Sequence, residues 1–259
     1  MPRQQRLKSE SGYYHIMIRG NERRNIFHDD EDRYRLMDTL YEKKQGDKFY
    51  LHAFCLMDNH IHLFISEGIE DIALVMKRIT VSYVHYFNKK YNRIGHLFQD
   101  RFRSEAIEKE GYVLSLTRYI HQNPVKANMV KTASKYLWSS YNSYVDENYF
   151  SKILDMDTIL GLFSSDKEIA KKLFKNDMNV LAQDSFIDIP DNVNIIDESM
   201  AKELFEKYLL ERSIDLNKCP KVELAKMLKE FREETNLSFR KMSAITGLNK
   251  DKINQLLKS

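Results

Sequence analysis

Residues 49–66, FYLHAFCLMDNHIHLFIS, decide the fold of this 259-residue chain. The stretch contains two apolar runs, at 49–57 and 61–66, that are rich in aromatic and branched residues, which is the composition of β-strands. Asp58 and Asn59 stand between the runs, and both residue types favour turns because their short side chains bond to nearby backbone groups. The stretch therefore predicts two strands joined by a turn.

The segments around these two strands alternate between strand and helix patterns. Short apolar runs predict strands, and apolar residues at helical spacing predict helices. By these rules the chain has a strand at 13–19, helices at 29–45 and 72–87, an edge strand at 104–108, and a helix at 111–123 that Pro124 stops. The order β-α-β-β-α-β-α predicts an α+β fold, with an antiparallel sheet and helices on one face.

His60 and His62 lie on one predicted strand, with Ile61 between them. Because side chains alternate along a strand, the two imidazoles point to one face and Ile61 points to the other. Two imidazoles held in this way can share one divalent cation. The alternative is a pair of half-exposed histidines on a sheet face. The remaining histidines are interpreted as structural, and they include His15, His52 and His85.

Tyr119 and Asn123 are four residues apart, so they share one face of the predicted helix. The amide of Asn123 is a candidate third metal ligand. A phenol has a pKa of about 10 and needs a metal or a base before it can attack a phosphate. Two alternatives stand beside this one: Tyr119 is a packed aromatic among 15 tyrosines, and Asn123 is a helix cap before Pro124.

Five blocks of sequence, taken in order, resemble the single-tyrosine HUH transposases, and most of all the branch that includes the REP-associated tyrosine transposases. The blocks are YHI, RGN and IF within residues 14–27; LMDNHIHL at 56–63; YFN, GHLFQ and RF within 86–102; YI and NPVK within 119–126; and WSSY at 138–141. Each block alone is short, and their shared order makes the resemblance specific. It covers about residues 12–145.

The resemblance implies a ferredoxin-like α+β domain that uses a divalent metal, Mg or Mn, held by His60 and His62. It implies that Tyr119 is the nucleophile, which attacks single-stranded, hairpin-bearing DNA and forms a covalent 5′-phosphotyrosine and a free 3′-hydroxyl. The implied function is a DNA transposase that cleaves and rejoins such strands. Insertion-sequence relatives have Gln one turn after the tyrosine, whereas this chain has Asn123, as the REP-associated branch tends to have.

Two other functions fit parts of the same sequence. A domesticated DNA-binding regulator that no longer cleaves would keep the fold, although it has no need of His60, His62 and Tyr119 together. A metal hydrolase of small molecules would use the two histidines, but the sequence offers it no nearby carboxylate ligands or general base. The transposase is favoured because it uses all three residues.

Cations and aromatic residues interleave over residues 89–103. This pattern is typical of single-strand binding, in which cations follow the phosphates and rings stack on unpaired bases. The alternative is a long helix with a solvated basic end. The predicted DNA contacts of this part of the chain are Arg19, Lys89, Lys90, Arg93, Phe98, Arg101 and Arg103.

The pattern changes along the chain and predicts three parts. These are a catalytic domain at 1–145, an acidic helical connector at 146–198 and a helical domain at 199–259. A basic balance suits a polyanionic partner, although a small excess also fits ordinary surface variation. The net charge of +3 combines +6 for residues 1–140, −5 for 141–195 and +2 for 196–259.

The end of the chain predicts a helix-turn-helix, in which Gly247 makes the turn and Asn249 caps the second helix. The second helix would then add duplex DNA as a partner. The alternative is a helical hairpin used for packing or dimerisation. The apolar positions of the pair are filled by Met242, Leu248, Ile253 and Leu256, and its candidate DNA contacts are Lys250, Lys252, Asn254 and Gln255.

The two cysteines, Cys55 and Cys219, lie far apart, which argues against a disulfide framework and a thiolate metal site. The sequence does not open with an apolar leader, and no apolar run approaches the roughly 20 residues of a membrane-spanning helix. We therefore expect a cytoplasmic protein that has no membrane partner and acts as a monomer or a homodimer.

Overall fold

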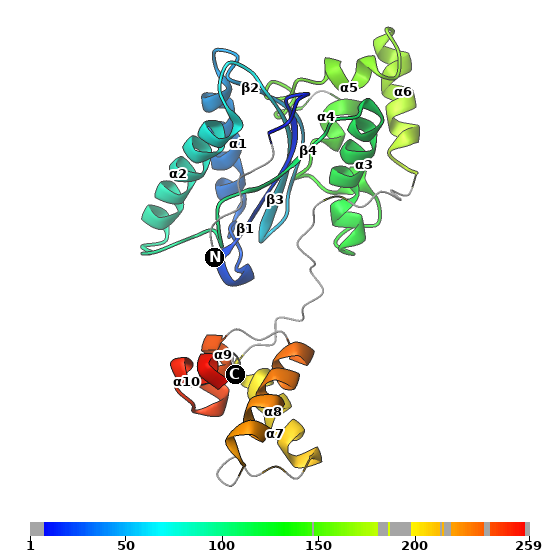
Figure 1. The fold of residues 1–259 in the computed structure, drawn as a ribbon. Coiled ribbons are helices and arrows are strands. Elements are labelled where there is room, and N and C mark those ends of the chain that lie inside the picture. The colour runs from blue at the N-terminus through cyan, green and yellow to red at the C-terminus, as the bar shows by residue number, and fades with distance from the viewer. Residues whose placement is uncertain are drawn as a thin grey trace. The chain divides into compact units, whose positions relative to one another are not determined.

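The computed structural model describes residues 8–146, 148–180, 186, 198–212, 214, 219–235 and 239–256. The chain divides into two compact units, Met1–Asp188 and Ile189–Ser259. The first unit contains a sheet with helices on both sides of it, and the second contains helices (Figure 1).

One antiparallel sheet, with strand order β2-β3-β1-β4, forms the centre of the first unit. Its strands are β1 (Tyr13–Arg19), β2 (Phe49–Leu56), β3 (His60–Glu67) and β4 (Arg103–Ala106). The long helices are α1 (Asp30–Lys44), α2 (Ile72–Lys90) and α3 (Glu110–Lys126). The predicted order β-α-β-β-α-β-α is confirmed, and so is the ferredoxin-like α+β class.

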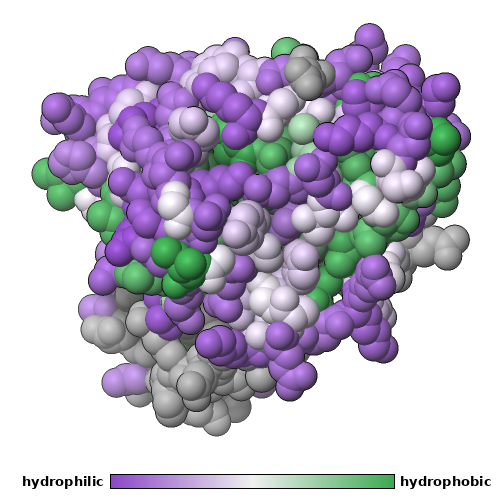
Figure 2. Space-filling model, turned by 90° about the horizontal axis from the view of Figure 1, so that it is seen from above, coloured by the Kyte–Doolittle hydropathy of each residue, from purple (hydrophilic) through white to green (hydrophobic). Residues whose placement is uncertain are grey.

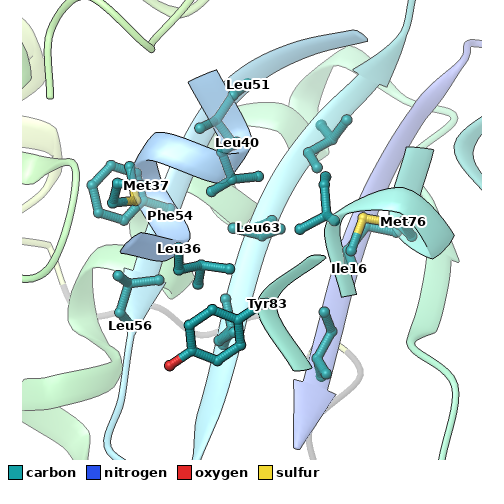
Figure 3. Packing of buried hydrophobic residues seen from close by; sticks show 14 of the residues in the cluster. Ile16, Leu36, Met37, Leu40, Leu51, Phe54, Leu56, Leu63, Met76 and Tyr83 are labelled. Carbon is teal, nitrogen blue, oxygen red and sulfur yellow. The ribbon is translucent and has the colours of Figure 1, made fainter. Parts of the chain in front are cut away.

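Helices α1 and α2 cover one face of the sheet (Figure 1). Each begins at an aspartate that accepts a bond from a backbone N–H of the first turn, Asp29 in α1 and Asp71 in α2. Figure 3 shows the apolar side chains between these helices and the sheet, with Leu63 of β3 among them. Burial of this hydrocarbon is the main favourable term in folding.

Helix α3 covers the opposite face together with three short helices, α4 (Tyr141–Val145), α5 (Asp157–Gly161) and α6 (Lys167–Asp177). Their apolar side chains form a second cluster against the sheet. It includes Ala53, Cys55, Phe64, Leu116, Ile120, Tyr144, Ile159 and Phe174. The sheet thus has helices on both faces, which adds a layer to the predicted arrangement.

The short helices α5 and α6 fall within residues 146–198, which the sequence predicts as a connector. Ile159 and Phe174 are completely buried against the second face of the sheet. The segment that contains α5 and α6 is therefore part of the first unit. Two 3₁₀ turns, Asn21–Arg23 and Ala133–Lys135, complete that unit within the described residues.

Helix α3 continues through Pro124 to Lys126, so the prediction that it stops at Asn123 is wrong. Proline removes one backbone N–H donor, and α3 accommodates that loss in its last turn. The backbone oxygen of Asn123 accepts a bond from the N–H of Ala127, which caps the helix. Asn123 is therefore inside the helix, and its interpretation as the cap is also wrong.

The second unit contains α7 (Glu198–Glu211), α8 (Lys221–Thr235), α9 (Phe239–Thr246) and α10 (Lys250–Leu256). Gly247 connects α9 to α10 with a φ of 68°, in the left-handed region that glycine adopts without strain. Met242 and Ile253 are fully buried, as their predicted apolar positions require. The helix-turn-helix assignment of this pair stays a prediction.

Hydrophilic residues cover most of the face seen in Figure 2, with smaller hydrophobic patches between them. Within the part of the chain that the structure describes, no helix combines the length and apolar character needed to cross a membrane.

Candidate active site

Strand β3 brings His60 and His62 to the face of the sheet that α3 covers. Ile61 joins the apolar core on the opposite face, as strand alternation predicts. The two imidazole centroids are 5.0 Å apart with the ring planes at 83°. Both side chains are buried, so the pair lies inside the protein and not on an open sheet face.

Each of these histidines bonds to the protein through Nδ1. Nδ1 of His60 is 2.6 Å from Oδ1 of Asn59, and Nδ1 of His62 is 3.0 Å from Nε2 of His15. Nε2 of His62 is buried and has no hydrogen-bond partner among the described residues. Burial, followed by the charges of His15, His60 and Arg19, holds the pKa of His62 well below its usual range. His62 is therefore neutral at pH 7, the form that binds metals.

This pair fits two ligands of a divalent cation, because buried Nε2 lone pairs are the atoms that imidazoles offer to metals. Among the described residues, no group of three or more His, Cys, Asp and Glu side chains is arranged to hold a metal ion. Further ligands would have to come from a side-chain amide, water or a substrate phosphate. The nearby candidate is Asn123, whose Nδ2 donates to the backbone oxygen of Tyr119 at 3.1 Å and whose Oδ1 is the ligand-type atom.

Helix α3 places Tyr119 against His62 and His15. The Tyr119 ring centroid is 5.8 Å from that of His62 and 5.7 Å from that of His15, both in edge-on contact. Nζ of Lys126, two turns later in α3, lies 4.6 Å from the centroid of the same ring. Phe186 packs against Tyr119 at 5.3 Å. The Tyr119 ring thus lies beside one candidate metal ligand, His62, and one cation, Lys126.

His15 belongs to this site, so its interpretation as an ordinary structural histidine is wrong. It contacts His62 and Tyr119, and its Nδ1 is 3.5 Å from Oε2 of Glu105 on β4. Glu105 and Lys126 were also not predicted as site residues. The signal that could have found His15 is its position on β1, on the same face as the His-x-His pair once the strands are paired.

Arg19 ends β1 directly opposite His60 in the strand register, and its side chain is buried. The next residue, Gly20, has no room for a side chain, because a Cβ atom there would clash with the backbone oxygen of Arg24. Its N–H donates to the backbone oxygen of Asn59 at 2.8 Å. The turns that flank the site are therefore bonded to each other, which fixes the start of β3.

Residues 8–123 match the model of the family described as "Transposase IS200 like". This segment is similar to the IS200-like transposases. For residues 8–123 this match confirms the resemblance to a transposase family that the sequence shows. A solved structure described as "Structure of the REP associates tyrosine transposase bound to a REP hairpin" is similar to 56% of this chain and 86% of that chain, with 22% sequence identity and a TM-score of 0.49. No curated protein matches the chain.

The IS200-like segment also contains a groove of about 1090 Å³ between α2 and residues 95–102. Lys89, Arg93 and Arg101 line it, and among the described residues none of them forms an ion pair. The aromatic and aliphatic lining includes Val81, Val84, Leu97, Phe98 and Phe102. Cations that form no ion pair among the described residues, around an apolar floor, suit a polyanion that carries rings. Arg103 is exposed on β4, outside this groove.

Lys90 has a different environment from Lys89, although the two residues are adjacent. Its Nζ is 2.8 Å from Asp29, 2.9 Å from Glu31 and 3.0 Å from Asp32. These ion pairs connect the end of α2 to the start of α1. Lys90 therefore has a structural role, which argues against its prediction as a DNA contact.

The candidate DNA contacts outside the IS200-like segment belong to α10. Lys252 and Gln255 are exposed on that helix. The side chains of Lys250 and Asn254 lie outside the described residues. The two that are described are accessible to a partner.

Proposed function

We propose that this protein is a metal-dependent DNA transposase that cleaves and rejoins single-stranded, hairpin-bearing DNA, with Tyr119 as the nucleophile. The observation that supports this most strongly is the contact of the Tyr119 ring with His62, whose own ring contacts that of His60. A buried pair of imidazoles with a phenol beside it suits attack on a phosphate more than simple packing does.

In this reaction the phenol oxygen of Tyr119 attacks a phosphorus atom, and the bond from that phosphorus to the 3′ oxygen of the neighbouring nucleotide breaks. The proton lost by the phenol is balanced by the proton gained at the new 3′-hydroxyl. Lys126 brings a positive charge beside the ring. A divalent cation, Mg²⁺ or Mn²⁺, held by His60, His62 and the amide of Asn123, would polarise the phosphate.

The phosphotyrosine keeps the free energy of the broken ester bond, so a second 3′-hydroxyl can attack it and restore a DNA strand. Rejoining therefore needs no nucleotide cofactor. Arg19, buried on the same face as His60, is placed to neutralise a phosphate that enters the site.

The groove beside α2 is the proposed binding surface for the DNA strand. Lys89, Arg93 and Arg101 would follow phosphates, and Phe98, which is half-buried and stacked on Tyr83, would receive a base. Arg103 on β4 would bind a phosphate outside the groove. In the second unit, α10 would add affinity for duplex DNA through Lys250, Lys252, Asn254 and Gln255.

A covalent trapping experiment tests this proposal. The protein is incubated with Mn²⁺ and a hairpin oligonucleotide labelled at its 3′ end, and a labelled adduct that resists denaturant is expected. Tyr119→Phe should abolish the adduct. Tyr112→Phe, in the same helix and exposed, is the matched control and should retain it.

Two other outcomes of this experiment would contradict the proposal, and each points to a different alternative. An adduct that persists in Tyr119→Phe would assign the nucleophile to another residue. Tight hairpin binding that ignores EDTA and leaves the DNA uncut would favour a non-cleaving regulator.

A further inference from the structure

His15 on β1 lies between His62, a candidate metal ligand on β3, and the carboxylate of Glu105 on β4. Its Nε2 is 3.0 Å from Nδ1 of His62, and its Nδ1 is 3.5 Å from Oε2 of Glu105. The His15 and His62 rings are stacked at 17°, with centroids 5.3 Å apart. His15 is almost completely buried, so its two nitrogens face these groups and not bulk water.

The strand register explains how three residues far apart in the sequence meet. Glu105 on β4 lies directly opposite His15 on β1. His62 on β3 lies opposite Met17, two residues from His15, so His15 and His62 are diagonal neighbours on one face. Each contact therefore depends on the pairing of β1 with a different strand.

A neutral imidazole has one N–H and one lone pair, so the partner of one nitrogen decides the state of the other. At 3.5 Å the Glu105 carboxylate forms no hydrogen bond with Nδ1 of His15, which is buried without a hydrogen-bond partner among the described residues. The negative charge of the carboxylate nevertheless favours the tautomer of a neutral His15 that has its proton on Nδ1 and its lone pair on Nε2. That lone pair accepts from Nδ1–H of His62. Nε2 of His62 is then left with its lone pair, in the buried position that has no other partner among the described residues.

We propose that His15 and Glu105 are positioning residues that hold His62 in the tautomer and ring orientation needed to bind a divalent cation. This inference rests on the proposed function, because it assigns His62 to that cation. Carboxylates that orient metal-binding histidines are common in proteins, and here a second imidazole extends the connection by one residue. His60 has its own partner in Asn59, so the two ligands are oriented independently.

Three variants separate the contributions of this chain of contacts. His15→Leu removes the acceptor for His62 and should weaken the binding of Mn²⁺ alone by about 10-fold to 100-fold, measured by isothermal titration calorimetry. His15→Gln places an amide oxygen near the former Nε2 and should restore most of the affinity. Glu105→Ala should weaken binding less than His15→Leu, because its contact is longer and its side chain is 30% exposed.

The matched control is His52→Gln, which changes another buried histidine of the same sheet. His52 bonds to Ser66 and Asp155 and has no contact with His62 or Tyr119 among those described. It should leave the Mn²⁺ affinity unchanged. Circular dichroism reports whether each variant is folded.

A second measurement needs no metal. Long-range ¹H–¹⁵N spectra of the metal-free protein report which nitrogen of His62 carries the proton. We expect Nδ1–H in the wild type and in His15→Gln, and a mixture of tautomers in His15→Leu.

The inference is overturned if His62 has the same tautomer in folded His15→Leu as in the wild type, or if that variant binds Mn²⁺ as tightly as the wild type. Failure of the proposed function looks different. In that case the wild type forms no DNA adduct, while the spectra still decide whether His15 controls the tautomer of His62.

Discussion

The two faces of the sheet come from the same strands but bury different chemistry. Under α1 and α2 the strands place hydrocarbon, such as Leu63 of β3, in a continuous apolar core. Under α3 the alternate residues of the same strands include His15, His60 and His62 beside apolar side chains such as Phe64, and the ring of Tyr119 lies against His15 and His62. A one-residue alternation in the sequence therefore places these histidines on one face only.

This difference assigns separate tasks to the two faces. Burying polar groups costs free energy unless each is bonded, whereas burying hydrocarbon stabilises the fold. Natural proteins accept such costs mainly where function requires them. We infer that the α1/α2 face of the sheet provides stability alone, whereas the α3 face combines its own apolar cluster with the groups for the reaction.

The variant His62→Leu is the sharpest test of whether the two faces have separate tasks. It replaces a polar side chain of the α3 face with hydrocarbon, the kind of side chain that the α1/α2 face buries. Loss of a metal ligand removes several kcal/mol of transition-state stabilisation, so adduct formation with hairpin DNA should fall more than about 100-fold. The midpoint of urea denaturation should fall only modestly, because hydrocarbon of similar size fills the space while Nε2 of the buried His15 loses its partner. An undiminished adduct rate would break the comparison.

The neighbouring change, Leu63→Ala, acts on the opposite face. It leaves a cavity in the apolar core and should lower the free energy of unfolding by about 2–5 kcal/mol, measured by urea denaturation. The folded variant should keep the Mn²⁺ affinity of the wild type. A large loss of Mn²⁺ affinity in protein that remains folded would show that the two faces are not separate.

The fold could be predicted from sequence where local patterns decide it. Alternation and helical spacing identified every strand and long helix from β1 to α3 in order. The second helical layer was not predicted, because α5 and α6 occur in an acidic stretch whose charges are on the surface. Net charge describes exposed residues and gives no information on which apolar side chains, such as Ile159 and Phe174, reach the core.

The site could be predicted only in part, for a related reason. His60 and His62 are found from strand alternation, a local property. The role of His15 depends on pairing between β1 and two other strands, which no local pattern specifies. The environment of Lys90 also depends on distant residues. Its carboxylate partners are in α1, about 60 residues earlier in the chain, so the local pattern around Lys90 gives no sign of them.

Acid should destabilise the protein through the α3 face, where buried neutral histidines are found. Burial lowers the pKa of His52 to about 4 and that of His121 to about 3. In the unfolded chain these groups protonate near pH 6.5, so stability is complete above that pH and falls as the pH drops toward the folded values.

Between pH 6.5 and pH 5 the loss should be about 2 kcal/mol for each histidine, since one pKa unit corresponds to about 1.4 kcal/mol. Urea denaturation at the two pH values measures it. His121→Gln, which can still bond to Ser140, should show a smaller loss than the wild type. Equal losses in the two proteins would exclude His121 as a source of acid sensitivity.

The smallest predicted effect concerns the outer side of the α1/α2 face, where two adjacent lysines differ. Lys89 lines the groove and forms no ion pair among the described residues, whereas Lys90 is held by Asp29, Glu31 and the buried Asp32. Lys89→Ala should weaken binding of single-stranded DNA a few-fold. It should also reduce the slope of log K against log salt concentration by about 0.7, the value for one phosphate contact.

Lys90→Ala is the matched control for that measurement. It should leave the salt slope of DNA binding unchanged and lower the free energy of unfolding, because Asp32 loses its cationic partner. Fluorescence anisotropy over a series of salt concentrations, in a Tyr119→Phe background with EDTA, measures binding without cleavage. If Lys90→Ala changes the slope and Lys89→Ala does not, the groove is not the DNA surface and the α1/α2 face contributes to folding alone.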